Sequence, residues 1–157
     1  MRINNRDIIA GTMNAFSASL CALICAVCLT ACDGSDDMAP EHLTFHFRMQ
    51  GDATGVQDFR ATTSDPAVIA DVRAQLALPV EERTLFIIGG IDRGNGGHNL
   101  DWNWHFLADQ WSLAELAIEL CDGNAVLVSQ AVDYWVDTVG QFCPWGARVS
   151  AEVSDSQ

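Results

Sequence analysis

Three side chains near the middle of the chain have the chemistry of an acid–base or metal site. His105 follows the aromatic stretch WNW, and Glu119 and Asp122 follow in ELCDGN. A histidine and two carboxylates are groups that general acid–base catalysis and metal binding use. The spacing matches no HxxxH, HxH or paired-cysteine motif, however, and a histidine on a sheet face commonly hydrogen-bonds a carboxylate on a neighbouring strand. The sequence therefore favours a structural role for His105, no enzyme activity, no metal and no cofactor. The alternative is a small hydrolase or metal-dependent enzyme using His105 with Glu119 or Asp122.

Tryptophan is the second kind of side chain that could bind a ligand. The five tryptophans are Trp102, Trp104, Trp111, Trp135 and Trp145. Most tryptophans in a small domain lie in its core, but an exposed indole offers a flat apolar face for stacking on a sugar or an apolar group. The candidates for such a ligand platform are Trp102, Trp104 and Trp145.

The leading segment has the layout of an export signal. Arg2 and Arg6 precede residues 8–31, which hold no charged side chain and are mostly apolar. The stretch LTAC, ending at Cys32, resembles the lipobox of bacterial lipoprotein signals. In that family the signal is cleaved before the cysteine, which then carries fatty acyl chains such as palmitate. The resemblance implies a signal peptide over 1–31 and a lipidated Cys32. A plain secretory signal and an uncleaved membrane helix are the alternatives.

Lipid on Cys32 fixes the expected partner and place of the protein. Two or three acyl chains anchor a protein stably to a membrane. Residues 32–41 are polar and turn-rich, and they predict a tether between the lipid and the domain. Asp33 resembles the inner-membrane retention signal of some enteric lipoproteins. The sequence therefore predicts an extracytoplasmic protein of the bacterial envelope, with the outer face of the cytoplasmic membrane favoured.

The other cysteines divide into two groups. Cys21, Cys25 and Cys28 have the C-x3-C-x2-C spacing of the iron–sulfur motif in radical SAM enzymes. They lie inside the signal-like segment, and the roughly 125 residues after it are too few for the barrel of such enzymes. Cys121 and Cys143 remain. An exported protein commonly joins such a pair in a disulfide, with two buried free thiols as the alternative.

The charge of the chain excludes several partners. It holds 8 basic residues, all arginine, against 21 acidic ones, for a formal net charge of −13. A nucleic-acid-binding protein needs a basic footprint, and attraction to anionic lipid needs a polybasic segment. The sequence has neither, so we expect no nucleic-acid partner.

The remaining residues predict a single α+β domain over 42–153, followed by a frayed tail at 154–157. Phe45 and Phe47 alternate with polar residues as in a half-buried strand, and Asp65 with Pro66 marks the start of a helix. The expected strands are 42–49, 56–62, 84–91, 102–106, 116–121 and 144–153, and the expected helices are 66–77 and 125–139. This β-β-α-β-β-β-α-β order predicts a mainly antiparallel sheet of about five to six strands packed by two helices.

The segment 112–121 fits two structures. Leu113, Leu116 and Leu120 have helical spacing, whereas Leu116, Ile118 and Leu120 alternate as in a strand. The segment is short, and CDGN ends it abruptly. We therefore favour a strand, with a helix as the alternative.

Three blocks carry a family resemblance: GIDRGNGGHNLDWNWHF, AIELCDGN and DYWVDTVGQFCPWGARVSAEV. Their order and spacing resemble a family of small, mostly secreted domains named after the N-terminal part of a calmodulin-binding protein. The resemblance covers about 42–153 and departs from the family pattern at Gln110 and Ala125, where typical members have proline. It implies the fold, the disulfide and secretion, but no known reaction.

Calmodulin itself is not an expected partner. Its targets are basic amphipathic helices, whereas residues 125–139 contain Asp133 and Asp137 and no arginine or lysine. The function that the sequence favours is a lipid-anchored extracytoplasmic binding or interaction module for an unknown protein or glycan ligand. The enzyme that uses His105 is the runner-up.

Overall fold

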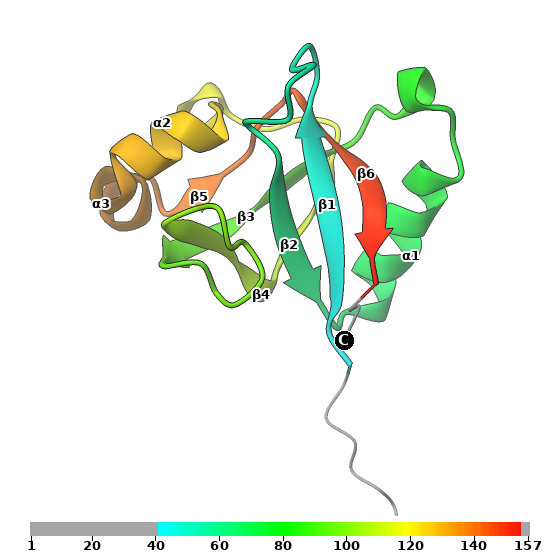
Figure 1. Cartoon of the computed structure of the whole chain (residues 1–157), viewed down its shortest axis with the longest axis horizontal. Helices are drawn as coiled ribbons and strands as arrows, with labels where there is room; N and C mark the ends of the chain where they lie inside the picture. Colours follow the sequence, from blue (N-terminus) through cyan, green and yellow to red (C-terminus); the bar gives the residue numbers. More distant parts are fainter. Residues whose placement is uncertain (1–40, 155–157) are drawn as a thin grey trace, which may run out of the picture. The chain divides into compact units, whose positions relative to one another are not determined.

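A computed structural model describes residues 41–154 of the chain, so the predictions for the signal peptide, for most of the tether, for Cys32 and Asp33, and for the end of the tail lie outside the described residues. The described part contains six strands and three α-helices, in the order β-β-α-β-β-α-α-β-β (Figure 1). The strands are β1 (Leu43–Met49), β2 (Phe59–Thr63), β3 (Phe86–Arg93), β4 (Trp104–Ala114), β5 (Gln141–Phe142) and β6 (Ala147–Val153). The helices are α1 (Pro66–Leu76), α2 (Ala125–Gln130) and α3 (Val132–Tyr134). Among these helices, none has the length and hydropathy that a membrane span requires.

The strands form two antiparallel three-stranded sheets, so the predicted α+β class with mainly antiparallel pairing is confirmed. In the first sheet, β1 is central, between β2 and β6. Phe45 and Phe47 are buried on its inner face, while His46 and Arg48 alternate with them on the outer face. None of the three described α-helices covers this outer face, which points toward the viewer in Figure 1.

The second sheet has the order β4-β3-β5. The register between β3 and β4 shifts between Gly89 and Ile91. A Cβ atom on Gly89 would collide with the backbone and Cβ of Trp111, so only glycine allows this approach. On the other strand of the pair, Asp109 has a φ of 59°, a conformation that Asp tolerates better than most residues.

Aromatic side chains join the two sheets into one core. Phe59 of β2 packs against Trp104, Phe106 and Phe142 of the second sheet, with ring centroids 5.6, 5.8 and 6.1 Å apart. All four rings are buried. Such rings bury large apolar areas, so this cluster is the main link between the sheets.

The predicted α1 helix is confirmed within one residue at its C-terminal end. The Asp65 side chain accepts a hydrogen bond from the Ala67 amide, and Pro66 is the first helical residue. The predicted helix 125–139 begins at Ala125 after the Asn124 cap, but it breaks at Ala131, whose φ and ψ are −138° and 43°. A π-helical turn, Trp135–Val139, completes the segment.

The predicted strand over 116–121 is wrong. β4 is one continuous strand that extends from Trp104 to Ala114, and a 3₁₀ turn, Glu119–Cys121, follows after an irregular segment at 115–118. The alternating Leu116, Ile118 and Leu120 are all exposed. Alternation indicates a strand only when one set of side chains is buried against a core.

Candidate binding site beside the disulfide

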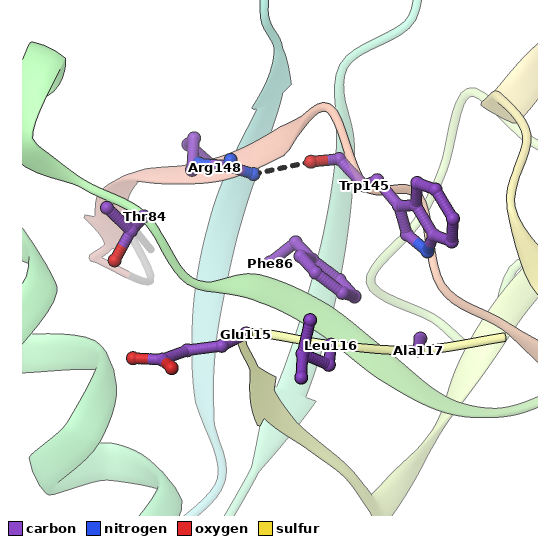
Figure 2. Close-up of a pocket in the computed structure, with 7 residues that line it drawn as sticks. All are labelled: Thr84, Phe86, Glu115, Leu116, Ala117, Trp145 and Arg148. Atoms are coloured by element: carbon purple, nitrogen blue, oxygen red, sulfur yellow. Dashed lines mark hydrogen bonds between the residues drawn. The ribbon is translucent and has the colours of Figure 1, made fainter.

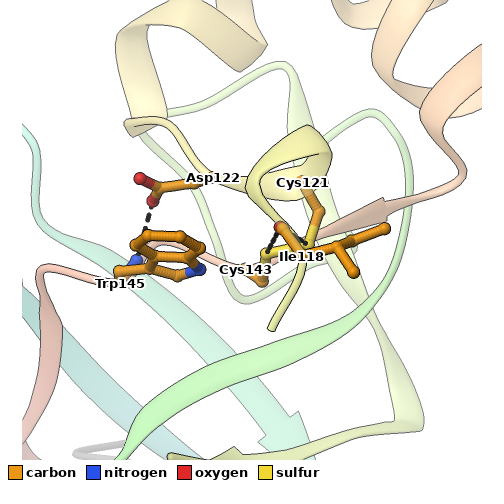
Figure 3. Close-up of a disulfide and its surroundings, with 5 residues drawn as sticks. All are labelled: Ile118, Cys121, Asp122, Cys143 and Trp145. Carbon is orange, nitrogen blue, oxygen red and sulfur yellow. Dashed lines mark hydrogen bonds between the residues drawn. A yellow bond between two sulfur atoms is a disulfide. The ribbon is translucent and has the colours of Figure 1, made fainter. Parts of the chain in front are cut away.

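The predicted disulfide between Cys121 and Cys143 is confirmed (Figure 3). The two Cα atoms are 5.1 Å apart, and both side chains are fully buried. The Cys143 amide donates a 2.8 Å hydrogen bond to the Cys121 carbonyl. This bond brings the cysteines together without a strand at 116–121, so the disulfide did not require the strand that we expected there.

The turn around the disulfide has further contacts. Asp122 accepts a 2.9 Å hydrogen bond from the backbone amide of Trp145 (Figure 3). The Ile118 carbonyl oxygen lies 3.2 Å from the Cys121 sulfur and 3.6 Å from the Cys143 sulfur. These two are close contacts without a shared hydrogen, because bonded disulfide sulfurs carry none. The turn and the chain after β5 are therefore fixed to each other at several points.

Large apolar side chains, which are normally buried, are exposed around the disulfide. The exposed fractions are 87% for Leu116, 59% for Ile118, 60% for Leu120 and 40% for Trp145. Each lies within five residues of one of the bridged cysteines. We call these four residues the apolar rim. A cluster of large exposed apolar side chains is typical of an interaction surface.

A pocket of about 260 Å³ opens next to the apolar rim (Figure 2). Its lining residues are Thr84, Phe86, Glu115, Leu116, Ala117, Trp145 and Arg148. Phe86 is the first residue of β3 and Thr84 lies two residues before it, while Leu116 comes from the segment after β4 and Arg148 from β6. The Trp145 carbonyl accepts a 2.7 Å hydrogen bond from Arg148, which fixes the loop that carries the indole.

The structure does not bring His105 together with the two carboxylates. His105 Nδ1 lies 2.9 Å from the Gly94 carbonyl oxygen, and its ring packs edge-on against His98. Within residues 41–154, no hydrogen bond or ion pair joins His105 to Glu119 or Asp122. In the same residues, no three His, Cys, Asp or Glu side chains are grouped as a metal site would require. Glu119 and Asp122 instead belong to the turn that carries Cys121.

The three tryptophans expected to form a ligand platform have different surroundings. Trp104 is fully buried, and its Nε1 donates to the Ala125 carbonyl, so its ring belongs to the core. Trp102 is half-buried and donates to the Asp58 carbonyl. Trp145 is exposed and lines the pocket. Of the three, Trp145 has the position that a ligand platform needs.

A serine, a histidine and an aspartate are in contact on the outer face of the first sheet. His46 Nδ1 lies 2.6 Å from Ser150 Oγ, and its Nε2 lies 3.4 Å from Asp58 Oδ2. Burial lowers the pKa of His46, against an opposing effect of Asp58. Ser150 Oγ also donates to the His46 carbonyl, so its single hydrogen is not available to the imidazole. A catalytic triad needs the imidazole to accept that proton, so we assign the contact between His46 and Ser150 to the pairing of β1 and β6.

Phe86 and Arg148 line the pocket but were not predicted from the sequence to do so. Alternation in ARVSAEV places Arg148 on the outer face of β6, because Ala147 and Val149 are buried. No sequence signal predicts the pocket itself, since its walls come from three segments that are far apart along the chain.

Comparisons with known proteins support the resemblance seen in the sequence. A family model described as the BP-74 N-terminal domain matches residues 31–156, which include all the described residues. Comparison with curated proteins and with solved structures gives no match. The family match covers most of the chain, including the disulfide, the apolar rim and the pocket. The chain belongs to the BP-74 N-terminal domain family.

Proposed function

We propose that this protein is a lipid-anchored extracytoplasmic binding module whose partner contacts the apolar rim and the pocket beside the disulfide. Cys32 carries the lipid, residues 32–41 form the tether, and the domain is displayed outside the cytoplasmic membrane. The lipobox-like LTAC sequence supports the anchor, and the uncharged segment before it supports export.

The exposure of the apolar rim is the observation that carries this proposal. The disulfide fixes the segment that carries the exposed side chains of Leu116, Ile118 and Leu120. Trp145 adds an exposed indole. A surface that is already rigid loses little conformational freedom when a partner binds. Burial of these side chains gives an apolar driving force of about 25 cal/mol for each Å² removed from water.

The chemistry of the rim favours a protein partner over a glycan. Three of its four members are aliphatic, whereas glycan platforms need flat aromatic faces with polar groups around them. In the sequence ELAIEL, Glu115 precedes Leu116 and Glu119 lies between Ile118 and Leu120, and both glutamates are exposed. The partner surface therefore combines apolar side chains with basic ones, which also suits the strongly acidic character of the whole chain.

Site-specific photo-crosslinking in intact cells tests this proposal. A photoreactive residue replaces Ile118 in the full-length chain, and in a matched control it replaces Val56, an exposed apolar residue in the turn between β1 and β2. We expect a discrete protein adduct from position 118 and none from position 56. The partner, identified from the adduct and purified, should bind Leu116→Ser at least about tenfold more weakly, which corresponds to the loss of one well-buried leucine.

Val56→Ser should bind the purified partner as the wild type does. Equal adducts at both positions, or no adduct at either, would contradict the assignment of the rim. Binding to a glycan array that is lost in Trp145→Ser, without a protein adduct, would instead make the ligand a glycan.

A further inference from the structure

The arginines of the described residues fall into two groups by their position on the fold. Arg73 pairs with Glu152 at 2.8 Å, and Arg93 pairs with Asp133 and Asp137 at 2.7 and 2.6 Å. These two cations have the carboxylate partners that an acidic protein offers in excess. They are ordinary surface ion pairs.

The other four arginines lie on or next to the outer face of the first sheet: Arg48 on β1, Arg60 on β2, Arg148 on β6 and Arg83 just before β3. Arg48 shares Asp58 with His46, and its Nε lies 3.3 Å from Oδ2. Within residues 41–154, the other three form no ion pair with a carboxylate. Positive charge is therefore concentrated on one face of a protein whose net charge is −13.

The register of the sheet makes this concentration unfavourable in the free protein. Arg48 and Arg148 are directly opposite each other in the β1–β6 pair. Like charges at opposed positions of an antiparallel pair destabilise it. The two arginines are opposite each other although acidic residues greatly outnumber basic ones in this chain. An anion bound between their guanidinium groups would remove the repulsion.

Backbone carbonyls hold the Arg83 guanidinium in place without neutralising it. Its Nε donates to Leu78, its Nη1 to Val149 and its Nη2 to Leu76, over 3.1, 2.8 and 3.3 Å. A carbonyl oxygen accepts a hydrogen bond but carries no full negative charge. The exposed Glu81 and Glu82 precede Arg83, and neither forms an ion pair with it in the described residues. Arg83 is therefore a fixed cation.

Arg148 is held in the same way. Its Nε donates to the Arg83 carbonyl at 2.8 Å, and its Nη1 donates to the Trp145 and Ala147 carbonyls at 2.7 and 2.9 Å. In the described part of the chain, no hydrogen bond from its Nη2 is formed, so that edge of the guanidinium has free donors. Burial lowers the pKa of Arg148, as expected for a partly desolvated cation without a counter-charge.

Three of these arginines, Arg48, Arg83 and Arg148, line a pocket of about 240 Å³. Its polar side chains are Arg48, Gln50, Arg83, Arg148 and Ser150, and two valines complete it. The arginine and glutamine side chains carry hydrogen-bond donors, the hydroxyl hydrogen of Ser150 is donated to the His46 carbonyl, and no carboxylate is among the lining residues. We propose that this pocket binds an oxyanion between Arg48 and Arg148. Arg148 also lines the pocket beside the disulfide, but the oxyanion proposal does not rest on a partner at the apolar rim.

A carboxylate, a phosphate or a sulfate group has the chemistry that the pocket accepts. Planar guanidinium groups donate two parallel hydrogen bonds to such oxyanions, and these charge-assisted bonds are stronger than neutral ones. The anion can be free or can belong to a larger ligand.

Arg48 lies five residues along β1 from Leu43, or roughly 17 Å at about 3.4 Å per residue in a strand. The pocket is therefore at the opposite end of β1 from the point where the tether enters.

Titration of the full-length chain in neutral detergent with phosphate, sulfate and acetate tests the proposal. Isothermal calorimetry gives the affinity, and NMR of the arginine Nε–H groups identifies the arginines that respond, both at constant ionic strength. We expect saturable binding of at least one anion, with shifts at Arg48 and Arg148. Arg48→Gln should raise the Kd about tenfold or more, as expected when one charge-assisted contact is lost.

Arg73→Gln is the matched control, because Arg73 is also exposed and paired with a carboxylate but lies outside the pocket. It should leave the Kd within a factor of about two, as expected for a surface charge away from the ligand. Circular dichroism of each variant checks the fold.

Anionic phosphatidylglycerol vesicles, compared with phosphatidylcholine vesicles, separate a lipid headgroup from a free anion. Absence of binding by all three anions and by the vesicles, or equal affinity of Arg48→Gln and the wild type, would overturn the proposal.

Discussion

Asp109 of β4 accepts a 2.6 Å hydrogen bond from the backbone amide of Ser64, which lies 45 residues earlier, between β2 and α1. The same carboxylate accepts from Thr63 Oγ1 at 2.8 Å, and Asp109 itself has a positive φ. One side chain therefore joins the end of the first sheet to the bend in the second. These hydrogen bonds lower the pKa of Asp109.

We predict that Asp109→Ala lowers the free energy of unfolding by about 1–3 kcal/mol. The substitution leaves the Ser64 amide without its hydrogen-bond partner, and it places alanine at a positive φ that alanine adopts only with strain. Asp109→Gly should lose less, since glycine adopts this φ without strain. Urea denaturation measures both variants. A larger loss for glycine than for alanine would contradict the role of the backbone.

The same contact predicts a dependence on pH. The folded pKa of Asp109 is below its unfolded value, so its contribution to stability is complete above the unfolded pKa of about 4. The contribution is lost as the pH falls through the lower, folded pKa. Unfolding measured at several pH values from 7 to 2 should show a decline in the wild type that is smaller in Asp109→Asn.

The disulfide should be a major source of stability. It closes a loop with a sequence separation of 22, for which the chain-entropy relation gives about 3–4 kcal/mol. We predict that a Cys121→Ser, Cys143→Ser double variant is destabilised by about this amount, measured by chemical denaturation. A reducing agent should destabilise the wild type similarly and leave the double variant unchanged.

Gly89 and Gly90 provide a paired test of the close approach between β3 and β4. A Cβ on Gly89 would overlap with Trp111, whereas a Cβ on Gly90 would meet its nearest atom, Leu107 Cδ1, at an ordinary 3.5 Å. We predict that Gly89→Ala lowers the free energy of unfolding by about 2 kcal/mol or more, as overpacking against backbone does. Gly90→Ala should be within about 0.5 kcal/mol of the wild type. Similar melting temperatures for the two variants would contradict this interpretation.

Lipid attachment at Cys32 can be measured directly. Mass spectrometry of membrane-extracted protein should find a mature chain that begins at an acylated Cys32, and Cys32→Ala should accumulate as an unprocessed precursor. Cys28→Ala, which changes a cysteine inside the signal, should be processed normally. An intact Met1 on the wild-type membrane protein would refute the lipoprotein assignment.

Asp33 gives a separate prediction about location. We expect the wild type in the cytoplasmic-membrane fraction of the native host and Asp33→Ser in the outer-membrane fraction. Sucrose-gradient fractionation makes the comparison. Recovery of the wild type in the outer membrane would reverse the proposed location.

Local signals in the sequence were sufficient for most elements of the fold. The alternation of Phe45 and Phe47 with polar residues defines β1, and the Asp65 cap with Pro66 defines the start of α1. Each signal depends on residues that are close in sequence and have one stable local arrangement. The disulfide was also predictable, because exclusion of the leading cysteines leaves one pair.

The predictions from the sequence fail where contacts between distant parts of the chain determine the local structure. Leu116, Ile118 and Leu120 have the pattern of a strand, but none of the six described strands pairs with this part of the chain, and the three side chains are exposed. The helix breaks at Ala131 without a proline or glycine there that would have predicted the break. Neither the pocket under Trp145 nor the arginine pocket was predictable, because each is assembled from distant segments.

The central place of β1 has a consequence for how the chain reaches its native state. Its partner β2 follows within the first part of the domain, but its other partner, β6, is the last of the described strands to be synthesised. Until residues 147–153 emerge, β1 is an edge strand with unpaired backbone groups, and such edges recruit other chains. Loss of β6 would therefore change a protected central strand into an aggregation site, so a chain truncated before residue 147 should aggregate rather than fold.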